Sequence, residues 1–358
     1  MSNNGGATFD IASIPTAVEG YLLAYVHEKK LAAAEIGTQY VTLWHEIERY
    51  VKTGGKRIRP MLAAALYQGY GGTHLDDVMP VAASWELLHS SLLVIDDIVD
   101  RDEARHGTAN IAGRYRKHYR NLKPEEAYHY ALSAALLAGD LLLIGSYEVL
   151  NESTLPAEQK VAMTRYIQKA FYEVGGGEHE DVQTVLLPIA SANPEAIIRY
   201  KTAGYSFQLP MLSGAALAGA DEAELIKITQ LGAHMGMLFQ LTDDLLGVFG
   251  DMVETGKPND SDIREKKRTV LLQSTYEALD PTKQKRLSEL YDTDYVMNDD
   301  DVQSVKQLMI ETGAQQANQR MVADEAKHAR KVIESMNMDV NTKVWLSGLI
   351  EKLEKRVA

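Results

Sequence analysis

Long helical periodicity is the feature that most constrains how this chain folds. Between Pro80 and Val99 apolar residues recur at spacings of seven, four and three, and the segments Ala131–Leu150 and Glu224–Val248 are similarly long and apolar. Alternating β-branched runs bounded by turn residues are almost absent. We therefore expect an all-α protein: a single large helical bundle around a central cavity.

The breaks between these segments are short, and no change of composition marks a linker. Residues 1–15 are rich in Ser, Asn and Gly, which predicts a flexible tail. We expect one all-α domain over residues 16–358.

Composition excludes several classes of protein. The 358 residues carry a formal net charge of -13, whereas nucleic-acid binders normally present a basic face. Without cysteine the chain has no disulfide framework and no thiolate zinc site. The N-terminus lacks the features of a signal peptide, and the apolar stretch Ala131–Ser146 is too short for a bilayer span and contains Asp140. We expect a soluble cytoplasmic protein without a transmembrane segment or a nucleic-acid partner.

Two aspartate pairs, Asp96–Asp97 and Asp243–Asp244, each lie near the end of a long apolar helix. Asp96 and Asp100 share one helix face, and Asp97 is turned about 100° away. Like charges at this spacing repel each other and oppose the dipole at a helix C-terminus. A hard divalent cation such as Mg²⁺ would compensate them. A solvated acidic helix end is the alternative.

Other acidic runs show that paired aspartates alone prove little. Asp76–Asp77 and Asp299–Asp301 are equally acidic, but they lie in polar stretches with turn residues nearby. We interpret both runs as solvated loop or helix-cap residues.

Basic residues beside glycines complement the aspartate pairs. The stretch GGKRIRP places three basic residues after two glycines, which let backbone amides approach an anion: Lys56, Arg57 and Arg59. Arg and Lys suit a diphosphate, although a basic helix start on the surface has the same pattern. Lys201 beside Thr202 and Lys257 in a Gly/Pro loop are similar islands. Together with the aspartates they predict a Mg²⁺–diphosphate site.

Other chemical motifs are missing or incomplete. HEIER at 45–49 lacks the second histidine of a zinc-protease helix, and HED at 179–181 has no partner at ligand spacing. From these spacings we expect no metal site built on histidine. No P-loop and no G-x-S-x-G motif is present, so a nucleotide is not the obvious diphosphate.

From Val51 to Thr269 the motifs follow one order: GGKRIRP, LLHSSLLVIDDIVDRDEARHG, LAGD, KTA, FQLTDDLLGVFGDMVETGKP and REKKRT. In this the chain resembles the trans-isoprenyl diphosphate synthases, the polyprenyl synthetase family, and most of all geranylgeranyl diphosphate synthases of actinobacterial type. The resemblance implies the all-α isoprenoid synthase fold, usually a homodimer, with the two aspartate motifs facing across a deep cavity.

The resemblance also implies a Mg²⁺-dependent reaction. C4 of isopentenyl diphosphate is joined head-to-tail (1'-4) to C1 of an allylic prenyl diphosphate, diphosphate is released, and the chain grows by five carbons. We expect geranylgeranyl diphosphate as the product, with a longer prenyl product next and farnesyl diphosphate third.

The family's site residues carry over as follows. Mg²⁺, three ions per site with substrate bound, is held by Asp96, Asp100 and Asp243, with Asp97 and Asp244 in support. Arg105, Lys201, Lys257 and Lys267 contact the allylic diphosphate, and Thr202 and Gln240 direct oxygens toward the allylic cation. Isopentenyl diphosphate is held by Lys56, Arg59, His89 and His106.

Three positions depart from the family pattern. His106 stands where a second arginine is usual, and a largely neutral histidine would hold a diphosphate less firmly. Gly247 stands where many relatives have a third aspartate, and Glu178 where a glutamine is common.

Product length in the family depends on bulk beneath the first motif. Ser91 and Leu92 lie about 6–8 Å before Asp96 along the helix, and neither is aromatic. Trp85, about 16 Å back, is either a deeper floor or a core residue.

Two rival functions stay open. A class I terpene cyclase also ionises a prenyl diphosphate with Mg²⁺, but it would lack the isopentenyl diphosphate site of GGKRIRP and His89. A regulatory subunit of a heteromeric synthase would be expected to lose its aspartate motif, and both pairs are present.

Overall fold

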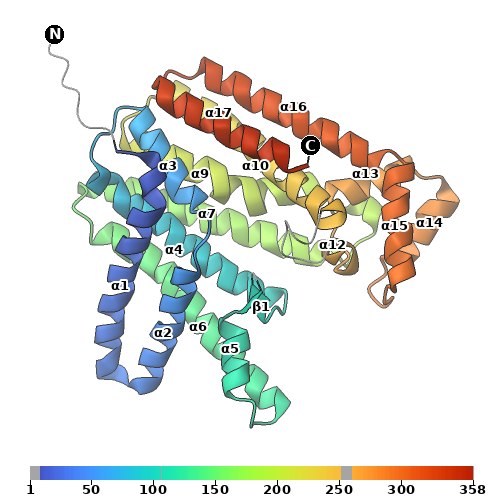
Figure 1. Cartoon of the computed structure of the whole chain (residues 1–358), viewed down its shortest axis with the longest axis horizontal. Helices are drawn as coiled ribbons and strands as arrows, with labels where there is room; N and C mark the ends of the chain where they lie inside the picture. Colours follow the sequence, from blue (N-terminus) through green and yellow to red (C-terminus); the bar gives the residue numbers. More distant parts are fainter. Residues whose placement is uncertain (1–8, 106, 251–259, 358) are drawn as a thin grey trace. The chain divides into compact units, whose positions relative to one another are not determined.

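The computed structural model describes residues 9–105, 107–250 and 260–357, and it is all-α apart from one short hairpin (Figure 1). The chain divides into two compact units. Unit 1 comprises Met1–Lys169 and Pro210–Ala220, and unit 2 comprises Ala170–Leu209 and Asp221–Ala358. The single domain expected over residues 16–358 stays a prediction.

Unit 1 is built mainly from the N-terminal helices. They are η1 (Ile11–Ser13), α1 (Ile14–Ile36), α2 (Thr38–Thr53), α3 (Ile58–Gly69), α4 (Leu75–Val99), α5 (Ile111–His118), α6 (Pro124–Asn151), the first part of α7 (Ala157–Thr184) and nearly all of α9 (Leu209–Leu217). A hairpin of β1 (Ala104–Arg105) and β2 (Thr108–Ala109) follows α4. The N-terminal tail was expected to reach residue 15, but residues 11–15 are helical because η1 and α1 begin there.

Helix α4 forms the core of unit 1, where it packs against α3, α6 and α1. Its side chains Trp85, Leu87 and Leu88 are fully buried, and each large apolar side chain contributes about 1.5–3 kcal/mol on burial. Gly139 lets α6 approach closely, since a Cβ there would lie 3.3 Å from Ile95 Cγ1. Helices α4 and α6 are long and apolar enough to span a membrane, but 78% of the apolar window of α4 is buried, as in the core of a soluble protein.

Unit 2 is built around α10 (Glu222–Phe249), which packs against η3 (Ile198–Gln208) and α16 (Ala314–Ser335). Its other elements are the second part of α7, η2 (Ile189–Ser191), α8 (Pro194–Ile197), α12 (Ser261–Arg264), α13 (Val270–Ala278), α14 (Pro281–Leu290), α15 (Asp299–Glu311), α17 (Val340–Glu354) and η4 (Lys355–Val357). Element η3 is a π-helix, which the sequence did not predict. Such helices are rare and are often found at functional sites.

The two acidic runs that we interpreted as loop or helix-cap residues lie at helix N-termini, which confirms the interpretation. Asp76 and Asp77 lie in the first turn of α4, and Asp299–Asp301 form the first turn of α15 after the N-cap Asn298. Carboxylates at a helix N-terminus are stabilised by the dipole. Asp96 and Asp97 lie at the opposite end of α4, so they need a different form of compensation.

Candidate active site

The first aspartate motif is compensated by an arginine from the hairpin. Because β1 folds back toward α4, Arg105 Nε donates to Asp97 Oδ1 at 2.9 Å, and its Nη2 donates to Asp96 Oδ2 at 2.9 Å. Burial raises the pKa of Asp97 to about 6, and the charge of Arg105 opposes this rise. Asp96 is partly exposed and Asp100 is exposed, so their oxygens can reach a ligand.

The loop between α2 and α3 is fixed by Arg57. Arg57 and Gly54 adopt positive φ angles of 48° and 54°, and the buried Arg57 side chain is turned inward. Its Nη1 donates to Glu86 Oε1, and its Nη2 donates to the Val51 carbonyl at 2.6 Å. Arg57 therefore holds the loop in place, whereas Lys56 is exposed and Arg59 is partly exposed.

A cavity of about 220 Å³ lies between this loop, α4 and the hairpin, all within unit 1. Its lining includes three arginines and a histidine: Arg49, Arg57, Arg105 and His89. Of the residues predicted to hold substrate, His89 and Arg105 line it, while Lys56 and Arg59 do not. Sequence reasoning missed Arg49 and Tyr50, which come from α2 before the glycines and carry no motif of their own.

The cavity wall combines a neutral imidazole with polar atoms that hold no internal partner. Burial, followed by the charges of Arg59, Arg105 and Arg57, lowers the pKa of His89 well below its ordinary value, so the ring is neutral at pH 7. Among the described residues, the buried atoms Tyr50 Oη and Glu86 Oε2 have no hydrogen-bond partner. Buried polar atoms are normally satisfied, so these atoms point to a polar ligand or to water.

In unit 2, a series of side-chain hydrogen bonds connects η3 to the second aspartate motif. Gly236 lets α10 approach η3, because a Cβ there would lie 2.2 Å from Ala203 Cβ. This approach brings Thr202 Oγ1 to 2.9 Å from Gln240 Oε1, to which it donates. Gln240 Nε2 in turn donates to Asp244 Oδ1 at 2.8 Å. These two hydrogen bonds fix the orientation of the Gln240 amide and of the Thr202 hydroxyl, the two groups that the sequence analysis singled out.

The two carboxyls of this motif differ in exposure. Asp244 is buried, and burial raises its pKa to about 8 even though Gln240 donates to it. The side chain of Asp243 is 54% exposed, and Arg356 Nη2 lies 3.8 Å from its Oδ1. Asp243 is therefore the member of the pair whose carboxylate oxygens are accessible from solvent.

Glu178, which departs from the family pattern, pairs with Lys201. Lys201 Nζ lies 2.9 Å from Glu178 Oε2 and 2.6 Å from Asp181 Oδ2. The contact depends on Gly177, since a Cβ there would lie 2.5 Å from the Lys201 backbone nitrogen. The predicted phosphate contact thus lies between two carboxylates of α7.

A carboxylate from α12 occupies the space beside Gly247. A Cβ at position 247 would lie 2.4 Å from Asp262 Oδ2, so an aspartate there would displace Asp262. Lys267 Nζ lies 3.6 Å from Asp262 Oδ1 and 2.9 Å from Glu265 Oε2. Asp262 thus brings a third carboxylate beside the second motif. Sequence reasoning missed it, although it lies in the stretch between the second motif and REKKRT.

The residues considered for product length differ in burial and in their contacts along α4. Ser91 is buried, and its Oγ donates to the Gly139 carbonyl of α6 at 2.8 Å. Leu92 is partly exposed. Trp85 is fully buried, and its Nε1 donates to Ser213 Oγ at 2.8 Å, which favours the core alternative for this residue. His106 and Lys257 lie outside the described residues.

The donor set fits a hard cation and an anion. In unit 1, Asp96 and Asp100 present carboxylate oxygens of the kind that Mg²⁺ prefers, and three arginines line the cavity beside them: Arg49, Arg57 and Arg105. In unit 2, Asp243 presents oxygens of the same kind. Arginine recognises phosphate oxygens through paired hydrogen bonds. Unit 1 therefore offers oxygen ligands of the kind that suit Mg²⁺ next to donors of the kind that suit a phosphate group.

Known proteins share this arrangement of sequence and fold. The family model described as polyprenyl synthetase matches residues 42–309. The short chain isoprenyl diphosphate synthase of Methanocaldococcus jannaschii is 32% identical over 249 residues, which cover 69% of this chain and 70% of that relative. The geranylfarnesyl diphosphate synthase of Aeropyrum pernix is 26% identical over 313 residues, covering 86% and 92%.

A solved structure extends the likeness to three dimensions. It is that of geranylgeranyl pyrophosphate synthase from Corynebacterium glutamicum complexed with isoprenyl diphosphate and magnesium. The TM-score is 0.88 at 28% identity, over 97% of this chain and 100% of that one. The chain belongs to the polyprenyl synthetase family and is a trans-isoprenyl diphosphate synthase, a prenyltransferase that elongates prenyl diphosphates.

Proposed function

We propose that this chain joins isopentenyl diphosphate head-to-tail (1'-4) to allylic prenyl diphosphates and that its main product is geranylgeranyl diphosphate. The observation that carries the proposal is the arginine-lined cavity directly beside the first aspartate motif. A cyclase that only ionises a prenyl diphosphate has no use for a second anion site next to its Mg²⁺ ligands. A regulatory subunit has no use for two intact motifs.

In this proposal the cavity of unit 1 takes the diphosphate of isopentenyl diphosphate. Arg49 and Tyr50 join His89 as contacts, and Tyr50 Oη is a hydrogen-bond donor with no internal partner among the described residues. Lys56 lies between the lining residues Gly55 and Arg57, so we retain it as a contact together with Arg59. Because His89 is neutral, it contributes a hydrogen bond rather than a charge. His106 remains in the proposed set.

The allylic substrate is ionised by breaking its C1–O bond. Asp96, Asp100 and Asp243 would hold Mg²⁺, three ions per site, with Asp97 and Asp244 in support, and the bound ions would supply positive charge to the leaving diphosphate. Lys201, Lys257, Lys267 and Arg105 contact that diphosphate. Lys201 would exchange part of its pairing with Glu178 and Asp181 for phosphate oxygens.

The remaining steps, formation of the C–C bond and loss of a proton, do not require a side-chain base. The π electrons of isopentenyl diphosphate form the C4–C1 bond, a proton then leaves the adduct, and the released diphosphate accepts it. The oxygens of Thr202 and Gln240, held at a fixed orientation by Asp244, face the allylic cation and stabilise its positive charge. Loss of the Thr202 hydroxyl would therefore slow ionisation more than it weakens substrate binding.

The proposed product length of twenty carbons is based on the residues that precede the first motif. Ser91 and Leu92 are both smaller than the aromatic residues that would block a tail at fifteen carbons. Product analysis with purified protein, Mg²⁺, excess isopentenyl diphosphate and each allylic primer tests the proposal. The dephosphorylated product should be the C20 alcohol. A dominant C15 or longer alcohol would refute the chain length, and consumption of the allylic substrate without isopentenyl diphosphate would favour a cyclase.

We also propose that the chain forms a homodimer in the cytoplasm. Helix α6 exposes large apolar side chains, including Leu136, Leu137 and Ile144 at 52%, 55% and 62% exposure. Exposed apolar patches of this kind are typical of protein interfaces. Light scattering after size-exclusion chromatography should give twice the chain mass for the wild type and a monomer for Leu137→Asp. A monomeric wild type would contradict the dimer.

A further inference from the structure

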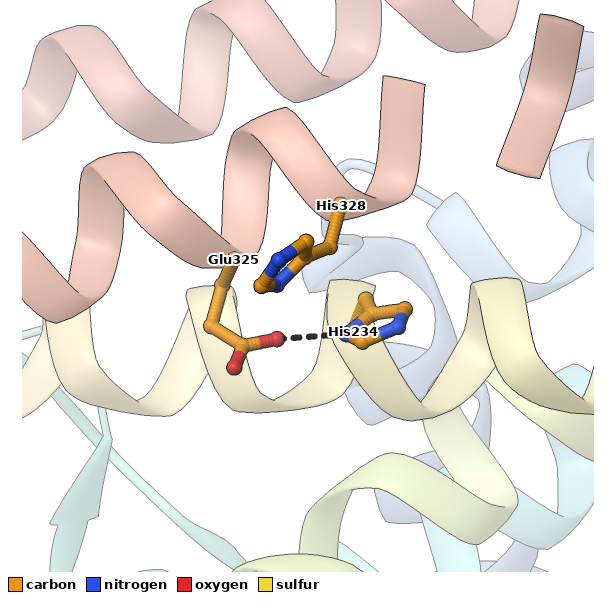
Figure 2. Close-up of side chains that lie close together, drawn as sticks. All are labelled: His234, Glu325 and His328. Atoms are coloured by element: carbon orange, nitrogen blue, oxygen red, sulfur yellow. Dashed lines mark hydrogen bonds and ion pairs between the residues drawn. The ribbon is translucent and has the colours of Figure 1, made fainter. Parts of the chain in front are cut away.

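Three side chains of unit 2 meet away from the substrate-binding residues: His234 of α10 with Glu325 and His328 of α16. Figure 2 shows them pointing toward one another from two neighbouring helices. His234 Nδ1 lies 2.7 Å from Glu325 Oε2, and the two imidazole rings lie 5.3 Å apart with a tilt of 42°. One ligand atom from each residue lies within 4.8 Å of the other two.

The local sequence explains why these residues meet. Glu325 and His328 are three residues apart on α16, so they share one face of that helix. Glu-x-x-His at this spacing, completed by a residue from a facing helix, is a recurring way to bind metal ions in helical bundles. Helix α10 packs against α16 and supplies His234 as the third group.

The donor set selects a particular class of ion. Two imidazoles and one carboxylate suit Zn²⁺, Co²⁺ or Ni²⁺, whereas Mg²⁺ prefers oxygen ligands alone. Bonds of about 2.0–2.2 Å place tetrahedral ligand atoms roughly 3.4 Å apart, so small side-chain rotations from the present spacing suffice. His328 is exposed and the other two are partly exposed, which leaves a path for the ion from solvent.

We propose that His234, Glu325 and His328 form a binding site for one divalent transition-metal ion, with a water molecule as the fourth ligand. The ion fastens α10 to α16. His234 precedes Asp243 by nine residues, which is about 13.5 Å along α10, so this ion is separate from the Mg²⁺ that the aspartates hold. Because α10 also carries Gln240 and Asp243, the ion stabilises the helix that presents the second motif.

Cobalt provides a direct probe of this site. Purified full-length protein is treated with a chelator, dialysed, and titrated with Co²⁺ in excess Mg²⁺, which occupies the all-oxygen sites. Four-coordinate Co²⁺ with nitrogen ligands absorbs visible light far more strongly than six-coordinate Co²⁺ with oxygen ligands. We expect one equivalent of strongly absorbing Co²⁺ in the wild type, displaced by Zn²⁺.

Matched variants locate the ion. His328→Gln and Glu325→Gln should each weaken Co²⁺ binding at least about tenfold and lose the strong visible band. His27→Gln on α1 and Glu334→Gln on α16 remove an exposed imidazole and an exposed carboxylate outside the cluster, so they should bind like the wild type. Circular dichroism and prenyltransferase activity with Mg²⁺ alone confirm that each variant is folded.

Thermal unfolding gives a second readout. Zn²⁺ should raise the Tm of the wild type in a concentration-dependent manner, because it binds the folded state, and should leave the Tm of His328→Gln unchanged. Absence of the visible band in the wild type would overturn the site. So would Co²⁺ affinity and spectra that are the same in His328→Gln, Glu325→Gln and the wild type.

Discussion

The two aspartate pairs share the pattern Asp-Asp-apolar-apolar but are compensated in different ways. In unit 1 the buried Asp97 pairs with the guanidinium of Arg105, and its pKa is raised to about 6. In unit 2 the buried Asp244 receives a hydrogen bond from the neutral amide of Gln240, and its pKa is raised to about 8. At pH 7 Asp97 is therefore largely ionised, whereas Asp244 retains its proton.

In each pair one residue is buried and the other is accessible. Asp97 and Asp244 have internal partners that orient them, while Asp96 and Asp243 are partly or largely exposed. The buried residue positions Arg105 or Gln240, and the accessible residue is placed to meet an ion. The same short motif thus supplies an accessible carboxylate and a buried, orienting carboxylate in both units.

The largest expected effect is on activity. Asp96→Asn and Asp243→Asn should each lower kcat/KM by about 10²–10³-fold, because each removes a charge that supports ionisation of the allylic diphosphate. Steady-state kinetics at saturating Mg²⁺ measure the loss. Asp76→Asn, which alters an exposed cap of α4, is the matched control and should retain wild-type kinetics. An equal loss of kcat/KM in all three variants would show that the two motifs have no special role in catalysis.

The next effect concerns Arg105, whose guanidinium pairs with the buried aspartate of the first pair. Arg105→Gln leaves the buried Asp97 without its counter-charge and should destabilise the protein by about 3 kcal/mol at pH 8. Without Arg105 the pKa of Asp97 rises above about 6, so the loss should be smaller at pH 5, where Asp97 is protonated. Urea unfolding of the wild type and the variant at pH 8 and at pH 5 measures the loss of stability at each pH. A loss that is the same at pH 5 and pH 8 would contradict this account.

A smaller effect concerns the proton on Asp244. From its unfolded value near 3.8 up to about 8, the folded metal-free protein retains a proton that the unfolded chain releases. Stability contributed by this proton is lost as pH rises through that window, with a slope of about 1.4 kcal/mol per pH unit. Between pH 6 and 7.5, Asp244→Asn should remove the part of the pH dependence of stability that comes from this proton. Parallel stability curves for the variant and the wild type would show that Asp244 does not titrate there.

Much of the fold could be predicted because helical periodicity is a local signal. The expected segments Pro80–Val99 and Glu224–Val248 lie within α4 and α10, and the capping role of Asp299–Asp301 follows from neighbouring residues. The π-helix η3 could not be predicted this way, because the periodicity of apolar residues does not distinguish it from an α-helix. Nor did the sequence show that Gly232 and Gly236 let α10 approach η3 closely.

Motifs marked candidate residues along the sequence, but they did not show which distant residues lie in contact. Arg57 has the same charge and setting as Lys56, yet its side chain is buried against Glu86, a partner on another helix. Asp262 approaches Gly247, and His234 approaches Glu325, across separations that leave no pattern in the sequence. Such contacts are set by packing, which spacing along the chain does not encode.

The central claim is that both aspartate motifs serve the same ionisation step. A double-mutant cycle with Asp96→Asn and Asp243→Asn tests it most directly through kcat/KM. If both carboxylates act on one Mg²⁺–diphosphate, the double variant should lose little more than the more damaged single variant. If the two fold-losses multiply, the motifs act independently and the claim is wrong.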